Sequence, residues 1–381
     1  MQIFKNLRFL SSGRISQTVK HMEKLIRKDV LNITPYIPGK PIEETKRQLK
    51  LKKVIKLASN ENPIGSSSKA VKAIEKSLSN INRYPDGTGF YLKRKIAKHL
   101  SLKPSNIVLG NGSDELIDVI IKTFVEKEEN VVTSDITFLE YEIISKVNGR
   151  QIITAPLKYF KYDLEGIKKK IDKKTKLIFI ANPNNPTGTY VTKYELDCFL
   201  RDLPETIVLV LDEAYDTFID VDDFPNSLDY LEKKNIIVLK TFSKAYGLAG
   251  LRIGYAIARE EFSTFMERVR QPFNVNSLAQ SAAIAALDDK EFLGKTKKVV
   301  LEGKNYLYAA LSSLGLAYVP SVANFILVDV GRDCLAVFKD MLKYGVIVRD
   351  MRQYDLKNFI RVTIGTKKEN ERFIKVLKKV L

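Results

Sequence analysis

The stretch IIVLKTFSKAYGLAGLRIGYAIA, residues 236–258, joins two apolar runs through a turn of small residues. The β-branched residues at its start predict a strand, Gly247 and Gly250 predict the turn, and the second apolar run predicts a second strand. We therefore expect Lys244 to lie between two buried strands. Burial disfavours the ammonium form of a lysine, and a neutral amine is what addition to a carbonyl group requires.

A lone lysine on a strand-connecting loop is usually a surface residue, but two neighbours of Lys244 favour a functional role. The hydroxyl of Ser243 and the guanidinium of Arg252 both suit a phosphate group. The pattern S-K-x-x-G-L-A-G-L-R resembles the lysine segment of the pyridoxal-phosphate aminotransferases of the aspartate aminotransferase fold. The resemblance implies that pyridoxal 5'-phosphate is the cofactor, that Lys244 binds it covalently, and that Ser243 and Arg252 contact it.

The length and composition of the chain limit the classes of protein to consider. A chain of 381 residues can bury a large core and ordinarily forms two domains. With 45% hydrophobic residues and no apolar run near 18 residues, it reads as a globular protein without a membrane segment. The net charge of +18 is spread over scattered lysines, so we expect no nucleic-acid-binding arm.

The cysteines and histidines narrow the chemistry further. Cys198 and Cys334 lie far apart and form no CxxC, which argues against a disulfide framework and a thiolate metal site and fits the reducing cytoplasm. The two histidines, His21 and His99, argue against histidine-based acid/base catalysis and against a metal site rich in histidine. Lysine and carboxylates are left to carry any catalysis, and no metal is expected.

The N-terminal part reads as an extension followed by an arm. Residues 1–21 contain basic residues and no acid, as targeting segments do, although an extension or an upstream start before Met22 is the preferred interpretation. The segment ITPYIPGKPIEE, residues 33–44, cannot be helical at its prolines and should form an extended arm. Tyr36 in this arm either packs against the protein or meets a ligand.

The central part of the chain alternates near-continuous apolar runs with amphipathic stretches. This pattern predicts a mostly parallel sheet covered by helices on both faces, with functional loops at the carboxyl ends of the strands. A first strand is predicted at LASNENP, residues 57–63, whose polar end places Asn60 in a ligand-binding loop. The further strands are predicted at residues 107–109, 130–133, 151–157, 177–181, 206–211 and 235–239.

After Pro272 the pattern changes to long helices mixed with strands, which predicts a smaller α+β domain. We therefore expect an α/β protein with an N-terminal extension and arm (1–56), a large cofactor-binding domain (57–271) and a small C-terminal domain (272–381). The predicted C-terminal elements are helices at 277–287 and 291–314, strands at 323–330, 346–348 and 359–364, and a final helix from Thr366.

Two segments of the central part predict contacts with the cofactor. GNGSDE, residues 110–115, joins a strand to a helix whose first amides are unpaired, so Gly112, Ser113 and Asp114 could bind a phosphate; a plain capping turn would use the same residues. The resemblance places the ring of Phe138 against the pyridine ring, where many relatives have tyrosine.

Two further motifs match the same family. In ANPNNPTGT, residues 181–189, the resemblance assigns Asn185 to the phenolic oxygen of the cofactor, near the substrate carboxylate. In VLVLDEAYDTF, Asp212 ends a buried strand, where a carboxylate is costly without a partner. The resemblance supplies the protonated pyridine nitrogen as that partner and assigns Tyr215 to the phenolic oxygen. A cap or a pair with an arginine is the structural alternative for Asp212.

Within the superfamily, the segments TPYxPG, NENP and NRYP and the C-terminal arginines most resemble the histidinol-phosphate aminotransferases. The resemblance implies that Arg361 binds the substrate α-carboxylate and that Arg349 and Tyr36 meet the phosphate or side chain of the substrate. It also implies a homodimer with shared active sites, in which Tyr84 reaches the cofactor phosphate of the neighbouring subunit.

The implied reaction is transamination in histidine biosynthesis, from L-histidinol phosphate and 2-oxoglutarate to imidazole acetol phosphate and L-glutamate. Lys244 would move the proton of the substrate. An aromatic-amino-acid aminotransferase and a threonine-phosphate decarboxylase are alternatives with the same core. A non-catalytic regulator or nucleic-acid binder on this fold is favoured only by the net charge of +18, and the intact Lys244 argues against it. We expect a cytoplasmic enzyme with no nucleic-acid or membrane partner.

Overall fold

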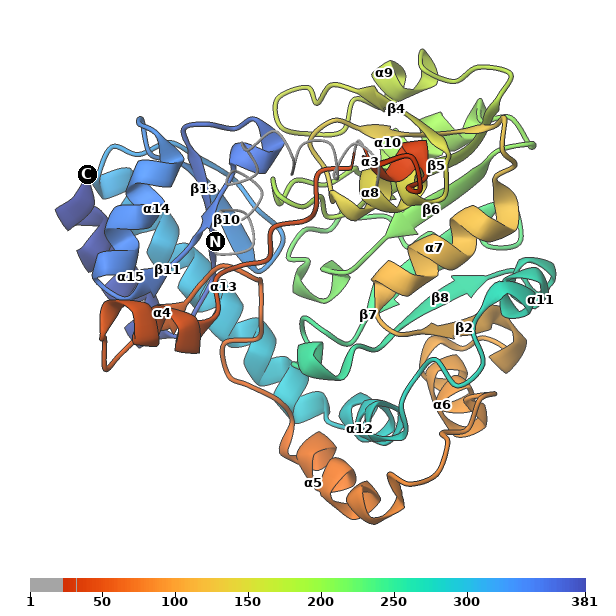
Figure 1. Cartoon of the computed structure of the whole chain (residues 1–381), viewed down its shortest axis with the longest axis horizontal. Coiled ribbons are helices and arrows are strands. Elements are labelled where there is room, and N and C mark those ends of the chain that lie inside the picture. The colour runs from red at the N-terminus through yellow and green to blue at the C-terminus, as the bar shows by residue number, and fades with distance from the viewer. Residues whose placement is uncertain (1–22, 32) are drawn as a thin grey trace.

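The computed structural model of the protein describes residues 23–31 and 33–381. The basic segment 1–21 and the alternative start at Met22 lie outside this range. Figure 1 shows a larger part built on a seven-stranded sheet and, in blue, a smaller C-terminal part. In spatial order the large sheet consists of β2 (Ile107–Gly110), β8 (Gly254–Ala258), β7 (Ile236–Thr241), β6 (Val208–Asp212), β5 (Thr175–Ala181), β3 (Asn130–Ser134) and β4 (Gln151–Ala155).

The large sheet is mostly parallel, as predicted, with one exception. The pairs β6–β7, β5–β6, β3–β5 and β3–β4 are parallel, whereas β8 runs antiparallel to both β7 and β2. The loop of residues 242–253 between β7 and β8 contains only a short 3₁₀-helix, η5 (Ala249–Leu251), in place of a crossover helix, and β8 returns beside β7. Because every residue of β2, β3, β6 and β8 is buried, both faces of the sheet are covered.

Helices surround this sheet and complete the larger core. α7 packs along β2, β7 and β8, and α12 packs on α5 and contributes alanines to the same core. The predicted domain boundary at residues 271/272 stays a prediction. The helices of this part are α5 (Ser68–Ser77), α6 (Phe90–Leu100), α7 (Ser113–Phe124), α8 (Glu140–Val147), α9 (Leu164–Lys168), α10 (Lys193–Arg201), α11 (Glu260–Val269) and α12 (Ser277–Leu287).

The smaller part has its own sheet and its own core. Its strands lie in the order β12 (Arg349–Asp350), β13 (Phe359–Thr363), β10 (Phe325–Asp329) and β9 (Tyr318–Val319), and adjacent strands are antiparallel. A second hydrophobic cluster joins these strands to the C-terminal helices. The helices are α13 (Lys290–Ser313), α14 (Cys334–Lys343) and α15 (Lys367–Val380).

The N-terminal arm packs with the smaller part from Tyr36 onward, whereas its first helix, α3 (Lys28–Leu31), contacts α8 of the larger part. One prediction about the arm is wrong. The strand predicted at residues 57–63 is β1 (Ile55–Lys56), which pairs in parallel with β11 (Val346–Ile347). Leu57 donates its amide to Ile347 and accepts from Thr363, so it joins two segments of the smaller part and ends the strand. The arm also contains two helices, α3 (Lys28–Leu31) and α4 (Ile42–Leu49).

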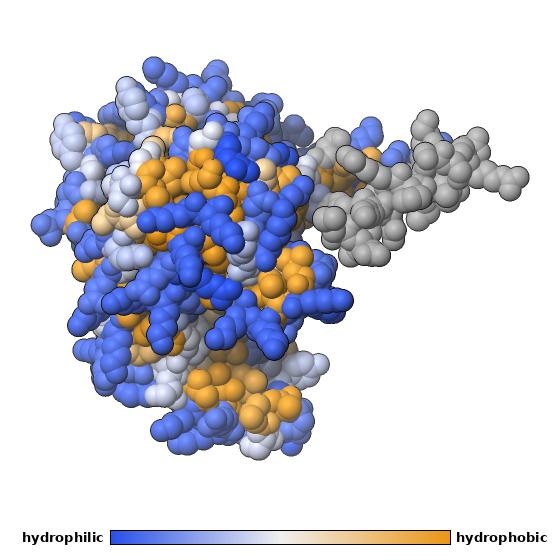
Figure 2. Space-filling view, turned by 90° about the vertical axis from the view of Figure 1, so that its left-hand side faces the viewer, coloured by the Kyte–Doolittle hydropathy of each residue, from blue (hydrophilic) through white to orange (hydrophobic). Residues whose placement is uncertain are grey.

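The surface of the smaller part is mainly hydrophilic. Figure 2 looks onto the side formed by this part and shows hydrophilic side chains with smaller hydrophobic patches between them. Within the described residues, no helix combines the length and the apolar character that crossing a bilayer requires.

Candidate active site

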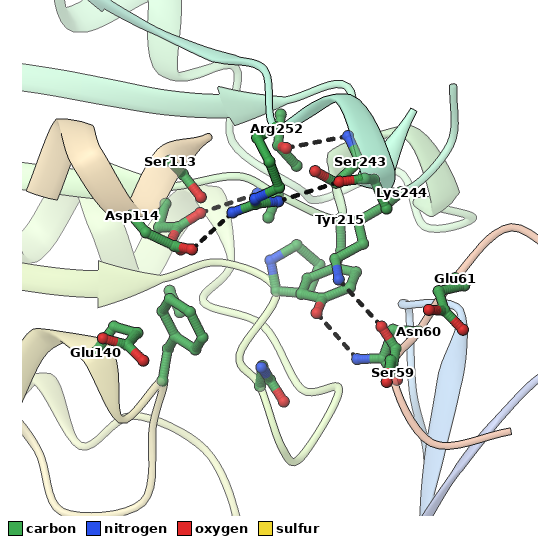
Figure 3. Close-up of a pocket in the computed structure, with 18 of the residues that line it drawn as sticks. Ser59, Asn60, Glu61, Ser113, Asp114, Glu140, Tyr215, Ser243, Lys244 and Arg252 are labelled. Carbon is green, nitrogen blue, oxygen red and sulfur yellow. Dashed lines mark hydrogen bonds and ion pairs between the residues drawn. The ribbon is translucent and has the colours of Figure 1, made fainter. Parts of the chain in front are cut away.

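A cavity of about 330 Å³ lies at the carboxyl ends of β5, β6 and β7, where the two parts of the chain meet. Figure 3 shows side chains of the larger part, among them Lys244 and Arg252, and those of residues 59–61 around this cavity. The structure brings most of the predicted site residues together here. Those lining the cavity are Tyr36, Asn60, Ser113, Asp114, Phe138, Asn185, Asp212, Tyr215, Ser243, Lys244, Arg252 and Arg361.

Lys244 lies in the loop between β7 and β8, as predicted, and its side chain points into the cavity (Figure 3). Its Nζ donates to the carbonyl of Ser59 at 3.2 Å and lies 5.7 Å from the ring centroid of Tyr215. The loop approaches its neighbours closely, because a Cβ at Gly247 would lie 2.1 Å from the carbonyl oxygen of Gly65. The Lys244 amine is therefore held by packed backbone and faces open space.

The N-terminus of α7 forms a cradle for an anion. Gly112 has φ +87°, a backbone conformation that favours glycine, and a Cβ there would lie 2.7 Å from Nη2 of Arg252, so a larger residue would strain the backbone and displace that guanidinium. The same Nη2 pairs with the carboxylate of Asp114 at 2.8 Å (Figure 3). The first amides of a helix lack intrahelical partners, and Ser243 lines the cavity near them. This combination of amides, hydroxyls and guanidinium fits a phosphate group.

Asp212 is a buried carboxylate at the end of β6. Oδ2 accepts a hydrogen bond from the hydroxyl of Tyr141 at 2.7 Å, and Oδ1 accepts from the amide of Ala214 at 3.1 Å. Burial raises the pKa of Asp212 to about 6, against the lowering effect of these two hydrogen bonds. No ion pair with Asp212 is found among the described residues. The carboxylate therefore fits a cationic group bound in the cavity.

Tyr141 is a residue that the sequence analysis missed. Its ring is fully buried, stacks on Phe179 at 4.6 Å between centroids, and meets Phe138 edge-on at 5.6 Å. Burial raises the pKa of Tyr141 well above its usual range, so its hydroxyl remains a donor to Asp212. Tyr141 follows Phe138 by three residues at the start of a helix, and this spacing could have indicated that the two rings lie on the same face. The spacing could not have indicated which carboxylate the Tyr141 hydroxyl contacts.

The buried Arg361 on β13 faces the cavity from the smaller part. It donates to the side-chain oxygen of Asn185 through Nη1 and to the carbonyl of Ala58 through Nη2, the latter at 2.8 Å. Its Nε is buried without a hydrogen-bond partner. Asn60 donates to the hydroxyl of Tyr215 at 2.9 Å, so this predicted substrate residue also orients a second predicted site residue.

Tyr36 lines the cavity, and the predicted substrate residue Arg349 lies behind it without lining the cavity. Arg349 is buried, and its guanidinium carbon lies 5.3 Å from the ring centroid of Tyr36. On the neighbouring antiparallel strand, Arg361 is the direct register partner of Arg349. Tyr84, in contrast, is 83% exposed, stacks on Phe273 and does not line this cavity.

Comparison with known proteins defines the class of protein to which this fold and site belong. Residues 52–377 match the family described as aminotransferase class I and II, and the chain belongs to that family. The predicted family, fold class and enzyme class are thereby confirmed. The histidinol-phosphate aminotransferases of Moorella thermoacetica and Caldicellulosiruptor saccharolyticus are each 48% identical to this chain, over 93% and 94% of its length and 92% and 100% of theirs.

Solved structures give the same result. Histidinol-phosphate aminotransferase from Sinorhizobium meliloti, in complex with pyridoxal-5'-phosphate, is 30% identical with a TM-score of 0.86, over 93% of this chain and 97% of that one. A single mutant of Thermus thermophilus aspartate aminotransferase, at 21% identity and a TM-score of 0.81 over 93% of this chain and 99% of that one, shares the fold.

Proposed function

We propose that this protein transfers the amino group of L-histidinol phosphate to 2-oxoglutarate, forming imidazole acetol phosphate and L-glutamate in histidine biosynthesis. One observation carries the choice of substrate. Arg349 and Arg361 are buried on adjacent strands as direct register partners, and neither has a carboxylate partner among the described side chains. Arg349 donates to Oε1 of Gln353, and Arg361 donates to Asn185 and Ala58, but these acceptors are neutral. Two like charges opposite each other are unfavourable, and an anionic ligand would stabilise them.

The two substrates meet this need in different ways. Histidinol phosphate carries a phosphate and no carboxylate, whereas glutamate and 2-oxoglutarate carry two carboxylates. The expectation that Arg361 binds an α-carboxylate therefore applies to the glutamate half of the reaction, and in the other half the phosphate takes that place. Guanidinium groups bind both kinds of anion through paired hydrogen bonds.

The proposed cofactor is pyridoxal 5'-phosphate, and the residues of the cavity fit it. The cradle at the start of α7, with Ser243 and Arg252, suits its phosphate, and the buried carboxylate of Asp212 suits its ring nitrogen. When bound, this cofactor supplies an aldehyde that accepts amines and a ring that takes up the electron pair released at the substrate α-carbon. The relative from Sinorhizobium meliloti, described with this cofactor, supports the assignment.

The side chains of this chain then have distinct tasks. The Nζ of Lys244 would hold the cofactor and, as a free amine, would take the proton from the substrate α-carbon. The carboxylate of Asp212 would favour a proton on the ring nitrogen, and Asn185 and Tyr215 would donate to the phenolic oxygen. Phe138 would supply an apolar surface for the ring.

A panel of amino donors tests the substrate. We expect histidinol phosphate to be preferred over phenylalanine, tyrosine and threonine phosphate. Arg349→Ala should raise KM for histidinol phosphate by roughly 10- to 150-fold, as expected for a lost charge-assisted bond, and leave KM for phenylalanine nearly unchanged. A wild-type preference for an aromatic donor, or release of carbon dioxide from threonine phosphate, would replace the proposed substrate and leave the family assignment in place.

Borohydride reduction tests the cofactor. The purified protein should be yellow, and reduction should fix the cofactor on Lys244, which peptide mass spectrometry would locate. Lys244→Ala should fold and retain no covalently bound cofactor. Cofactor fixed on another lysine would contradict the assignment of Lys244.

We also propose a homodimer with shared active sites in the cytoplasm. The exposed Tyr84 and Phe273 form an aromatic patch outside the cavity, and such a patch suits contact with a second copy. Tyr84→Phe should weaken cofactor retention by about 1 kcal/mol if its hydroxyl makes one hydrogen bond in the neighbouring site. Sedimentation of a fully active monomer would exclude this arrangement. The free Cys198 and Cys334 suit a reducing compartment.

A further inference from the structure

A cluster of buried charges lies next to the cavity without lining it. The Nζ of Lys240 lies 2.7 Å from Oε2 of Glu213 and also pairs with Oδ2 of Asp216. The other carboxylate oxygen of Glu213 accepts a hydrogen bond from the hydroxyl of Ser227. Glu213 is 4% exposed, so this is an ion cluster of the interior.

The residues of this cluster alternate along the chain with residues that line the cavity. In the segment Asp212-Glu213-Ala214-Tyr215-Asp216, Asp212 and Tyr215 line the cavity, whereas Glu213 and Asp216 bind Lys240. Lys240 lies on β7, four residues before Lys244 on the same chain. One ammonium group therefore joins both ends of the segment that carries Asp212 and Tyr215 to the strand that leads to Lys244.

The backbone supports the same connection. The amide of Glu213 donates to the carbonyl of Leu239 at 2.9 Å. This is the last backbone hydrogen bond between β6 and β7 before the two strands separate. Beyond this point the segment leaves the sheet and enters a short 3₁₀-helix, η3 (Asp216–Phe218). The ion cluster lies where the backbone hydrogen bonds between β6 and β7 end. Its ion pairs therefore hold the following residues, up to Tyr215, in a fixed position relative to β7.

The charge state of Lys240 is stable. Burial alone would lower its pKa, but the carboxylates of Asp216 and Glu213 raise it well above the usual range for lysine. Buried ion clusters stabilise a fold no better than apolar side chains of similar volume in many cases. Directional bonds from one ammonium to two carboxylates do, however, fix a relative position that apolar contacts leave adjustable.

We propose that Lys240 is a positioning residue that fixes Asp212 and Tyr215 relative to Lys244 through its ion pairs with Glu213 and Asp216. The inference rests on the proposed function, because it assigns the cluster to the geometry of the same site. Lys240 touches neither substrate nor cofactor and acts only through its neighbours.

The test compares Lys240→Met with Lys304→Met as a matched control. Lys304 is also a buried lysine, paired with Asp220 at 2.6 Å and donating to the carbonyl of Ser321, and it does not line the cavity. Both variants should lower the melting temperature. We expect Lys240→Met to reduce kcat at least tenfold with KM changed less than threefold, and Lys304→Met to keep kcat within threefold. Equal losses of kcat in the two variants would overturn the proposal.

A readout independent of catalysis separates this proposal from the proposed function. In the cofactor-free protein, amide hydrogen exchange at residues 213–216 should be at least tenfold faster in Lys240→Met than in the wild type and unchanged in Lys304→Met. Unchanged exchange in Lys240→Met would refute the proposal even if the wild type is an active transaminase. A wild type that binds no pyridoxal phosphate would refute the proposed function, while the exchange measurement would still decide the role of Lys240.

A second variant covers the case in which Lys240→Met does not fold. Asp216→Asn removes one ion pair at a side chain that is 32% exposed and leaves the pair of Lys240 with Glu213 intact. It should fold, exchange faster at residues 215–216, and shift the pH titration of the visible absorption of bound pyridoxal phosphate. Wild-type exchange, absorption and kcat in Asp216→Asn would overturn the proposal. Lys240→Arg, which retains the charge, should restore most of the kcat.

Discussion

The carboxyl group of Asp212 contributes to the pH dependence of the stability of the cofactor-free protein. Its pKa is about 6 in the folded chain and about 3.9 in an unfolded one, so the folded state favours the protonated form. Its contribution to stability is full below the unfolded pKa and is lost as pH rises through the folded pKa. Asp212→Asn should therefore stabilise the cofactor-free protein more at pH 8 than at pH 4.5, by on the order of 2 kcal/mol. Denaturant unfolding at both pH values measures this, and an equal effect at both would contradict it.

The hydroxyl of Tyr141 should tune the same carboxylate. Its hydrogen bond stabilises the ionised form, so Tyr141→Phe should raise the pKa of Asp212, by about one unit for a bond to a charged group. The pH midpoint for binding pyridoxal phosphate should rise by the same amount. Tyr162→Phe is the control, because Tyr162 is also buried but its hydroxyl bonds to Thr137 and to the amide of Ala181. A shift of the midpoint in both variants, or in neither, would argue against this role.

At this scale, the sequence was informative where an isolated residue was costly to bury. Asp212 and Arg361 stood in apolar runs and Lys244 stood between two of them, where a charge needs a partner, and all three line the cavity. Tyr141 and Lys240 gave no such signal. A tyrosine on an amphipathic helix and a lysine at a strand end are ordinary, and their importance comes from partners far along the chain, which spacing alone does not reveal.

Among the elements, strands of the large sheet were predictable because both of their faces are buried, so continuous apolar runs mark them. The antiparallel direction of β8 was not predictable, because an apolar run does not indicate whether a strand is parallel or antiparallel to its neighbours. Leu57 and Ala58 were predicted to be strand for the same apolar reason, but they are buried by bridging to the smaller part after β1 has ended. The packing of α12 on α5 also depends on tertiary contacts that its alanine-rich sequence does not specify.

The loop that carries Asn185 depends on one glycine. Gly188 has φ +77°, and a Cβ there would lie 2.1 Å from Oγ of Ser321 in the smaller part. Gly315 has a similar φ of +67° but no atom within 4 Å of a Cβ. Gly188→Ala should therefore cost about 1–3 kcal/mol more than Gly315→Ala, through overpacking added to the shared backbone cost. Urea unfolding of the two variants measures this difference, and equal costs would show that the loop moves freely. Only Gly188→Ala should also weaken substrate binding.

At the scale of the whole molecule, the cavity lies between the hydrophobic cores of the larger and the smaller part. A ligand bound there should therefore stabilise the folded state of both parts. Pyridoxal phosphate at 100 times its Kd should stabilise the folded protein by about 2.7 kcal/mol. Pyridoxal, which lacks the phosphate that suits the cradle at α7, should stabilise it less at the same concentration. Thermal unfolding with each compound checks this, and equal shifts would show that the cradle is not used.

The contacts of the arm also determine when this cavity can exist during protein synthesis. The carbonyl of Ala58 accepts its hydrogen bond from Arg361, a residue 303 positions later in the chain. Asn60 is likewise held by Thr363. At ~5–20 residues per second, a ribosome needs roughly 15–60 s to pass from one partner to the other. During that interval the wall formed by residues 58–60 has nothing to close against, so a nascent chain cannot hold substrate until the end of its synthesis.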